Sequence, residues 1–120
     1  MIWVKLGSLF MFFAVTLGAF GAHAMKTKLT PYALDVYKTA VLYHLIHAMG
    51  LFIVGWLSTI SVDPKIGLAG GFFTIGVVLF SGSLYLLSIT GCQWLGAIPP
   101  LGGLSFLLGW LFIFFVQMGQ

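Results

Sequence analysis

The chain has 120 residues, of which 61% are hydrophobic and only 6% are charged, compared with roughly 45–50% and about 25% in ordinary globular domains. So few charged side chains could not cover the surface of a water-soluble fold, which excludes a cytosolic enzyme, a nucleic-acid-binding domain and a disordered tail. The net charge of +3 comes from lysines in separate segments, and the single cysteine leaves no internal disulfide and no multi-cysteine metal site. The composition predicts an integral membrane protein.

Charged residues divide the chain into three uncharged stretches, at positions 6–25, 39–62 and 66–120. A membrane-crossing helix needs about 20 apolar residues, so each of the first two stretches accommodates one helix. The third stretch is more than twice as long as either, and a single helix of that length would far exceed the roughly 30 Å hydrocarbon core of a bilayer. Two helices are therefore expected within it.

Turn signals indicate where the helices end. Asp63-Pro64 marks a tight turn, because the residue before a proline is disfavoured in a helix. Gly91 can end the third helix, and Pro99-Pro100 suits the first turn of the fourth. The apolar runs are continuous and do not alternate, which argues against a β-barrel. We predict one all-α domain over 1–120, an integral membrane four-helix bundle with helices near 4–25, 39–61, 66–90 and 100–118.

The sizeable polar connection of the chain covers residues 26–38. Thr30 followed by Pro31 is typical of a helix N-cap with proline at the first helical position. This predicts a short interfacial helix over 31–38 that leads into the second span. Ala22-His23-Ala24 also has the form of a signal-peptide cleavage site, but the apolar run before it is long for a signal peptide, which favours a retained first helix.

Polar residues within the spans gather in one half of the predicted bundle, on the side of the 26–38 connection. In an antiparallel bundle the end of the first span, the start of the second and the end of the third all lie there. The candidate polar cluster comprises His23, Tyr43, His44, His47, Ser81, Ser83 and Tyr85. At about 1.5 Å per residue, the two central histidines lie roughly 8–14 Å below that surface.

The spacing of His44 and His47, three residues apart, places both on one helix face. Such a face could bind a metal or haem, handle protons or small solutes, or brace helices through hydrogen bonds. The bracing interpretation is favoured, because no intramembrane carboxylate or thiolate accompanies the pair. We therefore predict no metal, no cofactor and no catalytic residue.

Contacts are expected between the second and third spans, because the tight turn at 63–64 makes them antiparallel neighbours. On the second span Tyr43 or His47 should make the contact. Its partner on the third span should be Ser81, Ser83 or Tyr85. A charged imidazolium at this depth would lose its hydration without a carboxylate to compensate. We therefore expect His47, and secondarily His23, to be in the polar cluster in the neutral form.

Small residues recur at a spacing of four on three of the spans. This spacing places them on one helix face and permits close approach of a neighbouring backbone. The predicted helix-packing residues are Gly18 and Ala22, Gly67 and Gly71, and Ser105 and Gly109.

Four motifs carry a family resemblance: Leu17–His23 (LGAFGAH), Tyr43–Ala48 (YHLIHA), Leu79–Leu87 (LFSGSLYLL) and Pro100–Gly103 (PLGG). Together they resemble the YgdD-like domain-of-unknown-function family of bacterial inner-membrane proteins, which has small mitochondrial relatives. The resemblance implies a four-helix membrane protein without an established activity, and it places His23 and His47 at motif positions. It also implies that both termini are cytoplasmic, whereas the lysines are almost evenly divided between the two sides.

The expected function is non-enzymatic: an accessory or small-ligand- or lipid-binding protein of the inner membrane. One alternative is a small-solute or proton-conducting oligomer, and another is a haem- or metal-binding redox protein. The expected partners are the lipid bilayer, a second copy in a homo-oligomer and an unknown protein partner, with no nucleic acid.

Overall fold

The computed structural model describes residues 1–118, which are helical apart from short connections. The first two helices are α1, Ile2–His23, and α2, Pro31–Ile60. The third span consists of α3, Lys65–Gly76, a π-helical turn η1, Val77–Ser81, and α4, Gly82–Thr90. A 3₁₀ turn η2, Gln93–Ala97, leads into α5, Pro99–Phe114. Within the described residues, four helices are long and apolar enough to cross a membrane, which confirms the predicted all-α class.

Local chemistry explains where the helices begin and end. The Thr30 hydroxyl accepts a hydrogen bond from the backbone N–H of Ala33 at 3.1 Å, so α2 begins at Pro31. The predicted interfacial segment 31–38 is therefore the first part of one 30-residue helix, continuous with the second span. Gly91, with φ 71°, adopts the left-handed conformation that ends α4.

Two of the predicted helices end a few residues earlier than expected. The first helix covers Ile2–His23 instead of 4–25, because the backbone N–H groups of Ala24 and Met25 both bond to the carbonyl of Phe20 and tighten the turn. The last helix ends at Phe114 instead of position 118. Beyond it the chain turns toward the α2–α3 connection, where the backbone of Gln117 finds polar partners.

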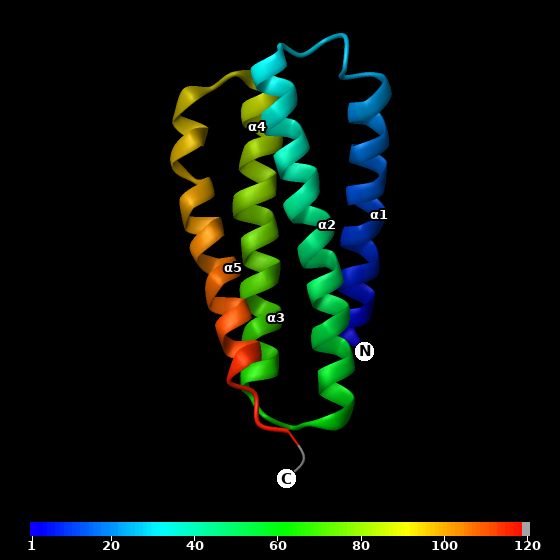
Figure 1. Ribbon diagram of the computed structural model, residues 1–120, viewed down its shortest axis with the longest axis vertical. Coiled ribbons are helices and arrows are strands. Elements are labelled where there is room, and N and C mark those ends of the chain that lie inside the picture. Colours follow the sequence, from blue (N-terminus) through cyan, green and yellow to red (C-terminus); the bar gives the residue numbers. More distant parts are fainter. Residues whose placement is uncertain (119–120) are drawn as a thin grey trace.

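The four spans form a flattened bundle, with Cα extents of 53 × 26 × 17 Å. Figure 1 shows α1 and α5 at its two edges, with α2 and the α3–η1–α4 span between them. α1 packs on α2, α2 packs on the third span, and α5 packs on α3 and η1. The N-terminus and the α2–α3 turn lie at one end, and the 24–30 and 91–98 connections lie at the other (Figure 1).

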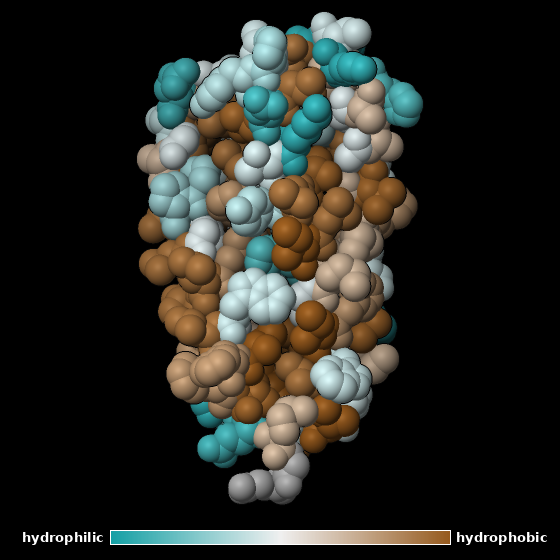
Figure 2. Space-filling view, viewed as in Figure 1, coloured by the Kyte–Doolittle hydropathy of each residue, from teal (hydrophilic) through white to brown (hydrophobic). Residues whose placement is uncertain are grey.

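Hydrophobic side chains cover most of the outside of the molecule. Figure 2 shows a broad hydrophobic zone on one face, with hydrophilic residues gathered toward the two ends. Large side chains such as Phe12, Trp56, Leu107 and Phe114 are at least 60% exposed. Such a surface is unfavourable in water and suits the hydrocarbon core of a bilayer.

Small residues let α1 lie close to α2. Three buried ones follow a spacing of seven residues: Gly7, Ala14 and Gly21. A Cβ at Gly21 would lie 2.5 Å from the ring of Tyr37, so only glycine permits this approach. Of the predicted pair on α1, Gly18 faces Val41, whereas Ala22 is exposed.

The predicted small-residue pairs on α5 and α3 differ in whether they contact another helix. Ser105 and Gly109 are buried against the third span, and a Cβ at Gly109 would lie 2.6 Å from the ring of Phe73. Gly67 and Gly71 have no atom within 4 Å of a Cβ added to them, so they make no helix contact within the described chain. Their spacing gave no information about which side of α3 faces α5, and the prediction for them is wrong.

Candidate functional site

His47 lies in the middle of α2 and is 3% exposed. Its Nδ1 lies 2.8 Å from the carbonyl oxygen of Tyr43, and its Nε2 lies 2.9 Å from the indole Nε1 of Trp110 on α5. An indole N–H can only donate, so Nε2 must accept. Nδ1 therefore carries the proton and donates to Tyr43, and this pairing requires a neutral imidazole.

Phe106 and Phe73 enclose the ring of His47. The Phe106 ring stacks on the imidazole with the ring centroids 3.5 Å apart, and the Phe73 ring meets it edge-on at 5.3 Å. The imidazole is thus held by the stacked Phe106 ring, by the edge-on Phe73 ring and, at both nitrogens, by hydrogen bonds. Its orientation is set by α2, α3 and α5 together.

His44, one turn earlier on α2, faces a different neighbour. It is 5% exposed, and its Nδ1 lies 2.9 Å from the hydroxyl of Tyr85 on α4. The ring of Phe10 on α1 meets the imidazole edge-on at 5.9 Å. The side-chain hydrogen bond between the second and third spans is therefore made by His44, and no hydrogen bond within residues 1–118 makes the expected pairing of Tyr43 or His47 with Ser81, Ser83 or Tyr85.

The two serines of the cluster have different roles. Ser81 is fully buried, and its hydroxyl donates to the carbonyl of Ala40 on α2 at 2.8 Å. It ends the π-helical turn η1, in which the backbone N–H of Gly82 reaches back to Val77. The hydroxyl of Ser83 bonds only within its own span, to the carbonyls of Leu79 and Phe80.

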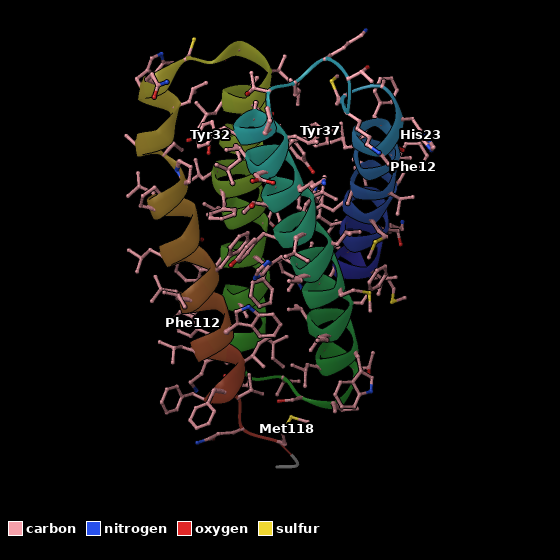
Figure 3. The ribbon with its side chains drawn as sticks, turned by 45° about the horizontal axis from the view of Figure 1, so that its top comes forward. Phe12, His23, Tyr32, Tyr37, Phe112 and Met118 are labelled. Atoms are coloured by element: carbon pink, nitrogen blue, oxygen red, sulfur yellow. The ribbon has the colours of Figure 1, made fainter. Side chains whose placement is uncertain are left out.

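His23 does not join the other polar residues. It is exposed at the end of α1, and Figure 3 shows it on the outer side of that helix, away from α2. Gly21 faces Tyr37 of α2, and a position two residues later lies about 200° further around a helix. The expectation that His23 is in the polar cluster is therefore wrong.

Sequence reasoning missed Trp110 and Tyr37 as partners. The Tyr37 hydroxyl donates to the carbonyl of Leu17 on α1, and this side chain is 1% exposed. Tyrosine and tryptophan carry a donor that needs a partner when buried. Both residues lie within predicted helices. The need of a buried Tyr hydroxyl or Trp N–H for a hydrogen-bond partner could therefore have identified them from the sequence.

A groove open to the outside lies between α2 and α5, and we call it the α2–α5 groove. Its volume is about 550 Å³, and its walls include Tyr43, His47, Phe80, Leu104, Phe106 and Trp110. Figure 2 shows a small hydrophilic area at mid-height on this face, surrounded by hydrophobic surface. The Tyr43 side chain is 38% exposed, and its hydroxyl makes no hydrogen bond to any residue in 1–118. It is available to a ligand.

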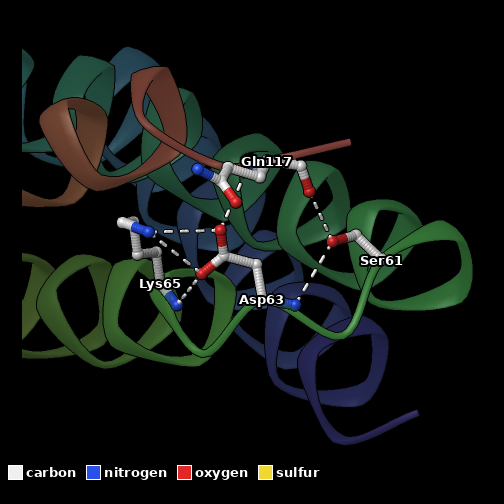
Figure 4. A network of polar contacts seen from close by, with 4 residues as sticks. All are labelled: Ser61, Asp63, Lys65 and Gln117. Atoms are coloured by element: carbon white, nitrogen blue, oxygen red, sulfur yellow. Dashed lines mark hydrogen bonds and ion pairs between the residues drawn. The ribbon is translucent and has the colours of Figure 1, made fainter. Parts of the chain in front are cut away.

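A second polar network lies at the opposite end of the bundle (Figure 4). The carboxylate of Asp63 accepts the backbone N–H groups of Gln117 and Lys65, each at 2.9 Å, and pairs with the Lys65 ammonium at 3.3 Å. The Ser61 hydroxyl donates to the carbonyl of Gln117 at 2.8 Å. The Gln117 N–H, followed by that of Lys65, holds the pKa of the Asp63 carboxyl below its usual value. This network holds the segment that follows α5 against the α2–α3 turn.

The geometry permits bracing and ligand binding more readily than proton relay. A relay through His47 would need a partner that accepts and releases protons on each side, and Trp110 can only donate. Within residues 1–118, no three His, Cys, Asp or Glu side chains lie close enough together to hold a metal ion. Every buried side-chain nitrogen and oxygen in that part of the chain has a hydrogen-bond partner.

Comparison with known proteins places the chain in a family. Residues 17–103 match the family described as "Protein of unknown function (DUF423)". The chain is 45% identical to the UPF0382 membrane protein YwdK of Bacillus subtilis, over 93% of this chain and 92% of that protein. It is 43% identical to the UPF0382 membrane protein SH2409 of Staphylococcus haemolyticus, over 93% of this chain and 91% of that protein. No solved structure matches. The chain is thus a membrane protein of the DUF423 family, whose function is unknown.

Proposed function

We propose that this protein binds a membrane lipid, holding one acyl chain in the α2–α5 groove without catalysing a reaction on it. The observation that carries the proposal is the groove itself: about 550 Å³, lined by aromatic and aliphatic side chains, with the Tyr43 hydroxyl at its wall. Sites of about 300–1,000 Å³ with apolar walls and a few polar groups are typical of small-molecule binding.

The length of the groove supports an acyl chain as the occupant. Its α5 wall runs from Pro100 to Trp110, which is about 15 Å of helix at 1.5 Å per residue. This equals half of a hydrocarbon core roughly 30 Å thick, the depth of one leaflet. A whole helix of a second copy, 10–12 Å across, fits a groove of this volume poorly.

The position of Tyr43 supports an ester-bearing lipid. It lies five residues, or about 8 Å, below Lys38 on α2, and side chains on a helix lean toward its N-terminus. The free hydroxyl therefore reaches toward the level where the acyl chains join the headgroup. There it can donate to an ester carbonyl while the chain lies on Phe80 and Phe106.

The proposal includes a placement in the cell. We propose that the chain, like the YgdD-like proteins it resembles, lies in the inner membrane with both termini cytoplasmic. Cys92, the single cysteine, is exposed in the connection at the opposite end from the N-terminus. It should react with a membrane-impermeant maleimide added to intact cells, without any engineered cysteine. Labelling only after the cells are opened would show the opposite orientation, with this connection in the cytoplasm.

The binding proposal is tested by filling the groove. Gly103 lines it, and a Cβ there would meet only the ring of Phe80, at 3.9–4.0 Å. Gly103→Leu should fill the space and leave the fold intact. Gly67→Leu is the matched control, a glycine on the outer face of α3 with no neighbour within 4 Å.

Each variant is purified in mild detergent, and the lipids that remain bound are counted by native mass spectrometry. We expect Gly103→Leu to lose a bound lipid that the original protein and Gly67→Leu keep. Equal lipid retention by all three proteins would contradict the proposal. Proton flux through reconstituted protein that disappears in His47→Leu would favour the conducting alternative instead.

A further inference from the structure

We propose a second lipid site, specific for an anionic phospholipid, in the groove between the end of α1 and the start of α2. We call it the α1–α2 groove; its volume is about 270 Å³, and it lies apart from the α2–α5 groove. Gly18, Gly21 and Ala22 form its α1 wall. This site goes beyond the proposed function, because it shares no lining residue with that groove.

The apolar part of the groove follows from the packing of the two helices. Tyr37 turns inward against Gly21 and bonds to the backbone of Leu17, so it draws α1 and α2 together. Beside it, the small residues of α1 leave a smooth wall opposite Val41 and Leu45. A flexible acyl chain can follow such a wall, since no bulky side chain projects from it.

Lys38 supplies the charge at the rim of this groove. It is exposed, and its aliphatic stem can lie along apolar surface while the ammonium reaches the headgroup level. Among residues 1–118 the one ion pair is Lys65 with Asp63, at the other end of the bundle. Within that part of the chain Lys38 therefore makes no ion pair, even with Asp35 three residues before it on α2.

The distribution of charge at this end favours the α1–α2 groove over the α2–α5 groove. Residues 26–38, which link α1 to α2 and include the first turns of α2, contain three lysines and one aspartate. The other connection at this end, residues 91–98, contains no charged residue. A phosphate with net negative charge is thus attracted to the side of the bundle where Lys38 lies.

The test compares phosphatidylglycerol with phosphatidylcholine of the same acyl chains. The full-length protein is reconstituted in nanodiscs containing equal amounts of both lipids, released into detergent, and its bound lipids are measured by native mass spectrometry. We expect phosphatidylglycerol to be retained preferentially. Lys38→Gln should reduce that preference about five-fold, the effect expected of one basic residue near a membrane surface. Lys5→Gln, which removes an exposed lysine at the other end of α1, should not change it.

A second pair of variants tests the groove independently of charge. Ala22→Leu places a larger side chain on the groove wall, and Ala19→Leu changes an exposed alanine of α1 that does not line it. Only Ala22→Leu should reduce phosphatidylglycerol retention. Equal effects of Lys38→Gln and Lys5→Gln, or no lipid preference in the original protein, would overturn the proposal. A change of oligomeric state in Ala22→Leu with unchanged lipid retention would also overturn it, by assigning the groove to a second copy.

The two proposed lipid sites can be refuted independently of each other. Gly103→Leu should leave the preference for phosphatidylglycerol intact, and Lys38→Gln should leave the lipid of the α2–α5 groove in place.

Discussion

The half of the bundle near the termini and the half near the 24–30 and 91–98 connections are held together in different ways. In the first half, interlocking apolar side chains such as Leu51, Val54 and Phe73 form a continuous core, and the hydrogen bond from Trp110 to His47 crosses from α5 to α2 at its edge. In the second half, hydrogen bonds cross between helices, from Tyr37 to α1 and from Ser81 to α2. The first half thus relies mainly on apolar packing between helices, and the second half relies more on hydrogen bonds between them. Both proposed lipid sites lie mainly in the second half.

One of the two largest expected effects concerns the close approach of α5 to the π-helical turn. A Cβ at Gly102 would overlap the backbone nitrogen of Phe80, which cannot move aside as a flexible side chain can. Gly102→Ala should lower the free energy of unfolding by about 1–3 kcal/mol. The measurement is thermal unfolding in one detergent, with Gly103→Ala as the control.

The control has space for its methyl group, because the nearest atoms to a Cβ at Gly103 lie 3.9–4.0 Å away. Alanine is favoured over glycine in helices by up to about 1 kcal/mol, so Gly103→Ala should be neutral or slightly stabilising. Equal destabilisation by both substitutions would mean that α5 does not lie this close to Phe80.

The next effect concerns the bond between Trp110 and His47. His47→Leu keeps an apolar side chain at the site but leaves the indole N–H without its acceptor, which should cost about 1–3 kcal/mol. His47→Ala should cost more, because it also removes contacts with Phe106 and Phe73.

A double-mutant cycle separates the hydrogen bond from the packing. Trp110→Phe added to His47→Leu removes the orphaned donor and should recover part of the lost stability. Strictly additive losses in the two single variants and the double variant would show that the bond does not brace α2 against α5.

A smaller effect is expected at Ser81. Its hydroxyl bonds to the carbonyl of Ala40 across the helix interface, and interhelical hydrogen bonds in membranes average about 0.6 kcal/mol. Ser81→Ala should therefore lower the free energy of unfolding by about that amount. Ser58→Ala is the control, because Ser58 bonds to its own helix at Val54. A larger loss at Ser58 than at Ser81 would contradict this assignment.

The smallest effect concerns the Asp63 network, which joins the segment after α5 to the α2–α3 turn. Because the folded-state pKa of Asp63 is lowered, its contribution to stability is present above the unfolded pKa near 3.8 and is lost as the pH falls through the folded value. Unfolding measured between pH 6 and pH 3 should show a small acid-dependent loss. That loss should be reduced in Asp63→Asn, and an identical pH dependence in both proteins would refute the role of the network.

The spans could be predicted from the sequence, but the pairing between them could not. Apolar length, Pro31, Gly91 and Pro99 fix where helices can form, because these signals are local. Which histidine meets Tyr85 depends on how α2 is rotated, and hydropathy gives little guidance when residues facing lipid and residues facing other helices are both apolar.

The π-helical turn adds a second difficulty. One extra residue in Val77–Ser81 rotates the residues that follow it by about 100° relative to a regular helix. The faces of the third span therefore change at this turn, and a regular helical period would not reproduce which side of it Ser83 and Tyr85 occupy. The α2–α5 groove likewise follows from the way α2 and α5 both rest on the third span, which no local pattern specifies.

The most direct test of the central claim is photochemical mapping of a lipid acyl chain on the protein. A phospholipid with a diazirine in its acyl chain is reconstituted with the protein, irradiated, and the labelled positions are read by mass spectrometry. We predict adducts concentrated at Leu104 and Leu107, which line the α2–α5 groove, over the equally exposed Leu101 and Leu111. Excess unlabelled lipid should compete for these adducts, and Gly103→Leu should remove them. Uniform labelling of all four leucines, unaffected by Gly103→Leu, would contradict the account.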